Sequence, residues 1–333
     1  MQTPSGILNQ PLKRSRIHIC SHTMGWIALM TMIIAGSTTA AFGKQLTGFF
    51  SPLSMLFLSE VMMLVFAILS FGFFPIVKKI IKLKSGLFLP LVTAGVMSGI
   101  LAPLFWFWGL QRTFAVNSQL FGMAETLFLI IFGTLFAHQA FRRSQGIGGL
   151  VMLLGLVVVA FEGFAQPFTI AIGDVAIVTA CFFYGIGGTI VGASLRKVEP
   201  QIIIFIRSGC AVLFFFAISP FIAHPFITEI RSFPITLIAV LISYGLISRF
   251  LLILGYYESI ERLPIATVSL LSTVSVAGAV LFTHLYLGEA VFWYHVAGVA
   301  LILTGSAVVQ WSSLSRFEKR LAHYVKAHHR QQM

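Results

Sequence analysis

The stretch FGTLFAHQAFRRSQGIGGLVMLLG at residues 132–155 returns at residues 282–305 as FTHLYLGEAVFWYHVAGVALILTG. Several positions keep their residue type at a constant offset of 150, among them Phe132/Phe282, Leu135/Leu285, Gly148/Gly298 and Gly155/Gly305. Near the start of each copy the offset is 148, in the pairs Gly25/Gly173, Thr31/Thr179 and Pro52/Pro200. A small change in loop length produces such a drift, so the chain contains two copies of one unit.

Composition indicates that this unit lies in a membrane. The chain is 58% hydrophobic and 10% charged, and its mean hydropathy is +0.95. A soluble domain carries about 25% charged residues, so a soluble fold is excluded. The net charge of +12 does not indicate a nucleic-acid partner, because the basic residues lie between the apolar stretches, where they set membrane topology. We expect membrane lipid to surround the protein and expect no nucleic acid to bind it.

Ten apolar segments are long enough to cross about 30 Å of hydrocarbon. Their predicted limits are 24–43, 53–75, 87–110, 115–137, 146–163, 170–193, 201–223, 234–257, 264–287 and 291–311. The first is interpreted as a permanent span, because the apolar part of a signal peptide is only about 7–15 residues long. The predicted organisation is a basic tail at 1–23, one repeat at 24–163, a second at 170–311, and a basic tail at 312–333.

Each repeat contains five spans, an odd number, so the second copy must cross the membrane upside down relative to the first. The predicted fold class is an all-α integral membrane protein with ten transmembrane helices in two inverted five-helix repeats. Inverted repeats of this kind build one central site in many secondary transporters.

Lysine and arginine positions predict the orientation. With the N-terminus inside, 17 basic residues fall on the inner side and three, Lys44, Arg112 and Arg231, on the outer side. Cytoplasmic loops carry the excess of Lys and Arg. We therefore expect both termini to be cytoplasmic in a multi-pass protein of the cell inner (plasma) membrane.

Two quoted motifs carry a family resemblance. GEAVFWYHVAGVALILTGSAVV at residues 288–309 resembles the pattern that closes an EamA half, and PQIIIFIRSG at 200–209 resembles the opening of its second helix. The chain thus resembles a ten-helix, EamA-type member of the drug/metabolite transporter (DMT) superfamily. The first half departs from the pattern, since Gln139 stands where Glu289 would be expected and Ser59 stands opposite Arg207. The resemblance implies a transporter whose cavity is walled by spans 1, 3, 4, 6, 8 and 9, with 5 and 10 at the periphery.

Four ionisable residues lie inside predicted spans: Glu60, Glu125, Arg207 and Arg249. A charge near the bilayer centre costs about 2.5–3.5 kcal/mol on insertion scales, so it usually faces a cavity or a partner. Glu125 and Arg249 differ in depth by roughly 6 Å at ~1.5 Å per residue, and we expect them to contact substrate or one another. A structural ion pair that holds helices together is the alternative. Glu60 and Arg207 are secondary candidates.

Further candidates surround Glu125. Ser118 and Gly122 share its helix face at helical spacing, and the repeat places Ser275 opposite it. Trp106 and Tyr256, related by the offset of 150, could stack on a flat solute, although Trp and Tyr also populate membrane interfaces. The predicted substrate-binding residues are therefore Glu125, Arg249, Trp106, Ser118, Tyr256 and Ser275.

Neither a cofactor nor a metal is expected. The three cysteines, Cys20, Cys181 and Cys210, show no CxxC or Cys/His spacing, so neither a disulfide framework nor a zinc site is predicted. No catalytic set such as HExxH and no Walker A sequence is present, so we expect neither an enzyme nor an ATP-driven pump.

A secondary active transporter of small organic solutes, working by alternating access, accounts best for these features. The substrate would be amino-acid-like or another charged or aromatic metabolite. A flippase of lipid-linked substrates, or a structural membrane protein without transport activity, is the alternative.

Spaced glycines suggest a packing surface. Gly148 and Gly155 lie seven residues apart, as do Gly298 and Gly305, so each pair shares a helix face. Small residues let membrane helices approach closely. These faces could pack spans five and ten of one chain together or join two copies into a homodimer.

Overall fold

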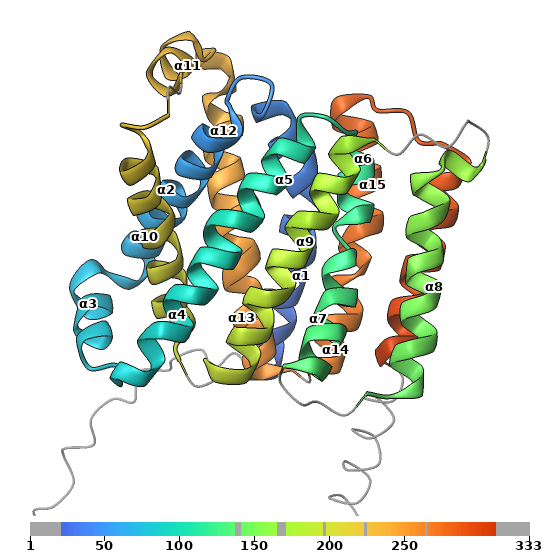
Figure 1. Ribbon diagram of the computed structural model, residues 1–333, viewed down its shortest axis with the longest axis horizontal. Helices are drawn as coiled ribbons and strands as arrows, with labels where there is room; N and C mark the ends of the chain where they lie inside the picture. Colours follow the sequence, from blue (N-terminus) through green and yellow to red (C-terminus); the bar gives the residue numbers. More distant parts are fainter. Residues whose placement is uncertain are drawn as a thin grey trace, which may run out of the picture.

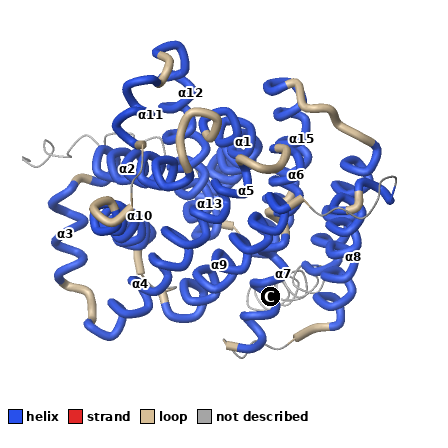
Figure 2. The backbone as a smooth tube through the Cα atoms, turned by 45° about the horizontal axis from the view of Figure 1, so that its top comes forward, coloured by secondary structure: helices blue, strands red, loops and turns tan. Residues whose placement is uncertain are grey.

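The computed structural model of the protein describes residues 21–136, 141–164, 171–195, 198–222, 225–263 and 265–310. Within these ranges the chain is helical apart from short loops and turns, as Figure 2 shows. Ten of the described helices are long and apolar enough to cross a membrane. The predicted all-α class with ten spans is therefore confirmed. Residues 1–20 and 312–333 of the predicted tails, and Gln139, lie outside the described residues.

The first half contains five spans. Its elements are α1 (Ser21–Leu46), α2 (Pro52–Phe71), the short α3 (Phe73–Ile81), a third span of η1 (Ser85–Leu87), α4 (Phe88–Gly95), η2 (Val96–Leu101) and α5 (Ala102–Leu110), a fourth of α6 (Ala115–Phe121) and α7 (Ala124–Leu135), then α8 (Arg143–Ala160) and η3 (Glu162–Phe164).

The second half repeats this order. Its elements are α9 (Ile172–Ser194), α10 (Pro200–Ile218), the short α11 (Phe226–Ser232), an eighth span of η4 (Ile235–Leu237), α12 (Ile238–Ser243), η5 (Tyr244–Leu251) and α13 (Leu252–Arg262), a ninth of α14 (Ile265–Ser272) and α15 (Val274–Leu287), and a last helix, Trp293–Gln310.

Local irregularities recur at equivalent positions of the two halves. Spans three and eight each contain a π-helical segment, η2 and η5. Spans four and nine are both interrupted, before Ala124 in one and before Val274 in the other. π-Helical turns occur frequently at functional sites, and transporters of inverted-repeat design often bind solutes at broken helices. The repeat is thus present in the helix geometry as well as in the sequence.

The second span ends earlier than predicted. Its helix stops at Phe71 because Gly72 adopts a φ of 78°, a left-handed conformation that glycine tolerates without steric cost. The chain then turns into α3, whose last turn carries Lys78 and Lys79. The apolar residues up to Pro75 therefore belong to a connecting helix rather than to the span.

The packing of the two halves follows the repeat. Helix α1 packs against α13 and α15, and its counterpart α9 packs against α5 and α7. Helices α2 and α10 pack against each other at one side of the bundle, and α8 stands at the other side, as Figure 1 shows. The predicted peripheral position of span five agrees with this arrangement.

The glycine faces predicted from the repeat pack α8 against the last helix within one chain. A Cβ atom placed on Gly148 would lie 2.4 Å from the carbonyl oxygen of Gly305, and one on Gly298 would lie 2.4 Å from a methyl group of Val159. Real Cβ atoms do not approach other atoms so closely, so glycine is required for this contact. These faces are therefore covered within one chain, and a homodimer would have to use another surface.

Candidate functional site

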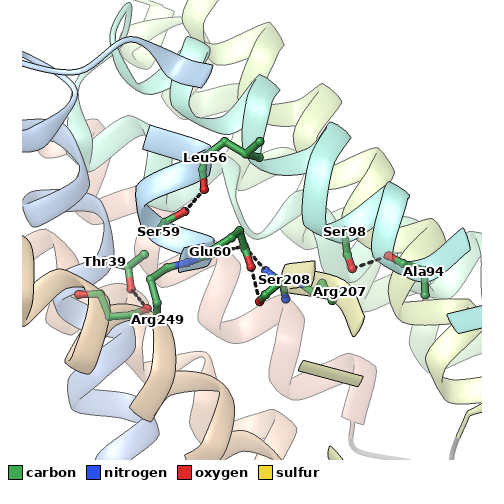
Figure 3. A network of polar contacts seen from close by, with 10 residues as sticks. Thr39, Leu56, Ser59, Glu60, Ala94, Ser98, Arg207, Ser208 and Arg249 are labelled. Carbon is green, nitrogen blue, oxygen red and sulfur yellow. Dashed lines mark hydrogen bonds and ion pairs between the residues drawn. The ribbon is translucent and has the colours of Figure 1, made fainter. Parts of the chain in front are cut away.

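Glu60 of α2 is the centre of a buried charged cluster, drawn in Figure 3. Its side chain has 0% exposure and accepts hydrogen bonds from Ser208 Oγ at 2.6 Å and from Arg207 Nη2 at 3.1 Å, both on α10. Arg249 Nη2, from η5, donates to the same Oε1 atom as Arg207. One carboxylate thus joins two guanidinium groups from different spans.

The repeat explains how these side chains meet. Glu60 and Ser208 occupy equivalent positions at the offset of 148, and they bond directly to each other. The counterpart of Arg249 at the offset of 150 is Gly99. A Cβ atom on Gly99 would lie 2.8 Å from Arg207 Cγ and 3.0 Å from the Arg207 carbonyl oxygen. Because Gly99 has no side chain, Arg207 can occupy the space beside it.

Hydroxyl groups connect the cluster to α1. Ser248, the neighbour of Arg249, shares a 2.7 Å hydrogen bond with Thr38, and its carbonyl accepts from Thr39 at 3.5 Å. Thr38 and Ser248 are both buried. Because a buried polar group costs free energy unless it is hydrogen-bonded, these bonds stabilise α1 against the π-helical segment that carries Arg249.

The cluster carries an excess positive charge. Two arginines face one carboxylate, and the Nε atoms of both Arg207 and Arg249 are buried without a hydrogen-bond partner. The side chains of Arg207 and Arg249 keep 15% and 10% of their surface exposed, whereas Glu60 keeps none. The arginines are thus the accessible part of the cluster, although their Nε donors themselves are buried.

Tyrosines and Glu125 extend the cluster along the bundle. Tyr184 of α9 interacts with the guanidinium group of Arg249 and lies within electrostatic range of Glu125. Glu125 of α7 is half-buried and lies within electrostatic range of Arg207 and of Tyr256. Tyr256 is 43% exposed. Glu125 and Tyr256 thus continue the cluster along a more accessible face.

The structure changes the pairing expected for the charged candidates. Arg249 bonds to Glu60 and not to Glu125, so the expected contact between Arg249 and Glu125 is wrong in this structure. The secondary candidates Glu60 and Arg207 form the centre of the charged cluster. Spacing along the spans predicted similar depths for Glu125 and Arg249, but the rotation of each helix decides which charges touch.

The other predicted site residues lie in apolar or locally bonded surroundings. Ser118 is fully buried and donates to Ala115 O at 2.8 Å. Ser275 donates to Ser272 O at 2.7 Å and lies against Gly36 of α1. Trp106 packs over Gly122. It also contacts three groups of buried apolar residues, which include Val116, Phe107 and Leu110 respectively.

A second polar cluster lies at the junction of α5 and α6. Lys44, at the end of α1, donates to Leu110 O and Thr113 O, each at 2.7 Å. Glu289 accepts from the backbone N–H groups of Ala115 at 2.9 Å and of Val116 at 3.0 Å, the first residues of α6. The carboxylate therefore caps α6, where the helix dipole favours negative charge. The sequence motif indicated Glu289, but not this partner.

Among the described residues, no group of three or more His, Cys, Asp or Glu side chains could hold a metal ion. The bundle of ten spans, with a buried charge cluster between α2, α10 and η5, defines a multi-pass membrane protein of the inverted-repeat kind.

The model of the EamA-like transporter family matches residues 23–161 and 171–311, and the chain belongs to this family. Both halves are covered, so the resemblance to the drug/metabolite transporter superfamily is confirmed. The description of this family names its members transporters.

Two curated proteins and one solved structure are similar to the chain. The chain is 27% identical over 185 residues to an uncharacterized transporter of Archaeoglobus fulgidus, covering 55% of this chain and 63% of that protein. It is 24% identical over 234 residues to an uncharacterized transporter of Methanothermobacter thermautotrophicus, covering 69% and 67%. The match thus spans less than two thirds of the first relative. A protein of known crystal structure shares the fold with a TM-score of 0.60 at 18% identity, covering 86% of this chain and 95% of that one.

Proposed function

We propose that the protein is a secondary active transporter of a small organic solute that carries a charged group, and that it works by alternating access. The substrate class is amino-acid-like, or another charged or aromatic metabolite. The observation that carries the proposal is the buried cluster of Glu60, Arg207 and Arg249 inside the predicted spans. Intramembrane charges of this kind mark substrate or ion pathways by default.

The charge balance favours an anionic group on the solute. Arg207 and Arg249 together exceed the single charge of Glu60, and both arginine side chains keep part of their surface exposed. Guanidinium groups bind carboxylates in two-point geometry, with hydrogen bonds about twice as strong as those between neutral groups. A solute carboxylate that reaches the accessible side of the two arginines would neutralise the excess charge.

Glu125 has two candidate roles. In its ionised form it balances the excess positive charge of the cluster, since it lies within electrostatic range of Arg207. It either pairs with the amino group of a zwitterionic solute or takes up a coupling proton when the anionic solute arrives. In the second case solute and proton move in the same direction, because protonation of Glu125 is what makes room for a second negative charge.

Aromatic side chains suit the non-polar part of such a solute. Tyr184 and Tyr256 lie within electrostatic range of Glu125, and Tyr256 has 43% of its surface exposed. Aromatic rings gain about 0.5–1.5 kcal/mol from stacking beyond the area they bury. We therefore propose that the two tyrosines contact the body of the solute while the charged groups hold its ends.

Alternating access is supported by the unequal ends of the bundle. Helix α6 packs against α15 at the end where Lys44 and Glu289 bond to the α5–α6 junction. Helices α7 and α14 are the other halves of the same two spans. Among the described elements, α7 and α14 do not pack closely against each other. The closed end is the one that the charge distribution predicts to be outside, so this arrangement suits access from the cytoplasm.

A ligand screen followed by transport assays tests the proposal. Purified protein is screened by thermal shift against amino acids, organic carboxylates and nucleosides, because a ligand that binds the folded state raises its apparent stability. Positive compounds are then assayed in proteoliposomes by substrate exchange and by uptake under an imposed pH gradient. Absence of both a thermal shift and exchange for every charged solute class would contradict the proposal.

Glu125→Gln separates the two roles of that carboxylate, and Glu199→Gln, in an exposed ion pair with Lys79, is the matched control. If Glu125 carries the proton, substrate exchange persists and the response to the pH gradient disappears. If it holds the amino group, binding weakens by roughly 10–100-fold, the range for a charged hydrogen bond of about 1.5–3 kcal/mol. Normal binding and normal pH-driven uptake would remove Glu125 from the mechanism.

The flippase alternative has less support. An apolar groove lies between α7, α8 and α9, and none of its lining residues is ionisable, so the groove itself offers no charged path for a lipid headgroup. We also propose that the protein lies in the inner (plasma) membrane with both termini in the cytoplasm. The orientation follows from the excess of Lys and Arg on the predicted inner side. A homodimer, if it forms, leaves the glycine faces of α8 and the last helix in place.

A further inference from the structure

An apolar groove of about 640 Å³ runs between α7, α8 and α9. Its walls include Phe121, Leu127 and Phe128 on one side and Leu150 and Leu153 on the other, and Gln145 is the one polar side chain among its lining residues. The volume falls within the ~300–1,000 Å³ typical of small-molecule sites. Since the groove lies on the flank of a bundle of membrane spans, it faces hydrocarbon rather than water.

The internal repeat generates a second, smaller groove of about 240 Å³ beside α15. Six of its seven lining residues correspond at the offset of 150 to residues that line the larger groove. Because the two halves are inverted, the paired grooves lie toward opposite faces of the membrane. The residues beside the two grooves at the membrane surface can therefore be compared position by position.

The two grooves differ where they meet the membrane surface. Arg142 and Arg143 lie in the chain between Phe141 and Gln145, which both line the larger groove, and Arg143 is exposed. Their counterparts beside the smaller groove are Phe292 and Trp293, which are 50% and 62% exposed. Exposed aromatic residues are ordinary membrane-interface anchors. Basic residues beside a groove between spans suit anionic lipid headgroups instead.

We infer that the groove between α7, α8 and α9 is a binding site for an anionic phospholipid, with one acyl chain in the groove and the headgroup phosphate at Arg142 and Arg143. A free anion would leave the apolar walls uncovered, and a zwitterionic lipid would bring no net charge to the arginines. The leaflet is the one that the distribution of basic residues predicts to be cytoplasmic, where anionic lipids attract polybasic segments. The site is separate from the Glu60 cluster.

Native mass spectrometry of the full-length protein tests the inference. The protein in mild detergent is titrated with phosphatidylglycerol or phosphatidylcholine of identical acyl chains, and bound lipid is counted. We expect phosphatidylglycerol to be retained preferentially. Arg142→Gln/Arg143→Gln should reduce that preference by about fivefold for each arginine, since a basic residue near an anionic surface contributes about 1 kcal/mol.

A second variant tests the acyl-chain half of the site. A Cβ atom on Gly149 meets only Leu127 Cδ2, at an ordinary 3.5 Å, so Gly149→Leu should fold and extend its side chain into the groove. It should lower retention of both lipids, while Val299→Leu at the equivalent position of the smaller groove should leave the phosphatidylglycerol preference unchanged. Thermal unfolding of each variant without added lipid measures whether the fold survives.

Several results would overturn the inference. Equal retention of the two lipids, or an equal loss in Lys82→Gln/Lys84→Gln, which removes exposed charges elsewhere, would show that no defined headgroup site exists. Displacement of the lipid by soluble glycerol phosphate would indicate an anion site without an acyl-chain groove. A change from dimer to monomer mass in Gly149→Leu would assign the groove to a second copy of the chain.

Discussion

Replacing Glu60 by glutamine should destabilise the protein strongly, because it removes the one negative charge between two buried arginines. The side chain is nearly isosteric, so packing survives, but the guanidinium groups of Arg207 and Arg249 are left facing each other in the interior. Breaking a buried ion pair by removing one partner costs about 3–5 kcal/mol. For a chain of this size that corresponds to a decrease in melting temperature on the order of 5–10 °C.

The two described free cysteines provide the assay. Cys181 is buried and Cys210 is partly buried, so both react with a thiol-specific fluorophore mainly after unfolding. Heating purified protein with such a reagent therefore reports the midpoint of unfolding in detergent. The control is Glu199→Gln, whose exposed ion pair with Lys79 contributes about 0–1 kcal/mol.

A double variant makes the reasoning more specific. Glu60→Gln/Arg249→Gln removes one of the two opposed cations, so it should be more stable than Glu60→Gln alone. Additivity fails for residues in one charged network, and the size of the deviation measures their coupling. The reasoning would be refuted if Glu60→Gln lowered the midpoint no more than Glu199→Gln, or if the second substitution destabilised the protein further.

Three other predictions concern topology and packing. A topology reporter fused after Lys84 should report a cytoplasmic position, and one fused at Gly288 an external position. A periplasmic signal after Lys84 would contradict the predicted orientation with both termini in the cytoplasm. Gly155→Leu should lower the melting temperature, because its Cβ would lie 3.0 Å from Leu301 Cβ and 3.1 Å from a backbone oxygen, whereas Gly209→Leu, with nothing within 4 Å, should not. Glu289→Ala should cost about 0.5–2 kcal/mol, as loss of a helix cap does, and an unchanged unfolding midpoint would contradict the capping role.

The repeat and the apolar periodicity were sufficient to predict ten spans and their order, because length and hydropathy are properties of each segment alone. The end of the second span was not predicted, since the positive φ of Gly72 depends on how the chain turns into α3. Pro75, three residues after Gly72, is the sequence signal that could have located this end, and no proline follows the helical Gly155 so closely. Span existence is thus a local property, whereas exact ends depend on neighbouring helices.

The pairing of the four charged residues was harder to predict than their position inside spans. A helical wheel assumes about 100° per residue, but η5 is π-helical, and its wider turns rotate the side chains that follow. Arg249 lies inside this segment, so its direction cannot be obtained from spacing in an ideal α-helix. The useful signal was the repeat, because the offset of 148 places Glu60 opposite Ser208, next to Arg207.

The charged cluster depends on differences between the two copies rather than on their likeness. Equivalent positions meet where the halves pack, so the same charged residue in both copies would place like charges side by side. The chain avoids this with Glu60 opposite Ser208. The absent side chain of Gly99 makes room for Arg207, and the carboxylate of Glu60 holds the arginines together. The two inverted repeats thus have equivalent backbones. A few sequence differences where the repeats pack together produce a cluster with a net charge.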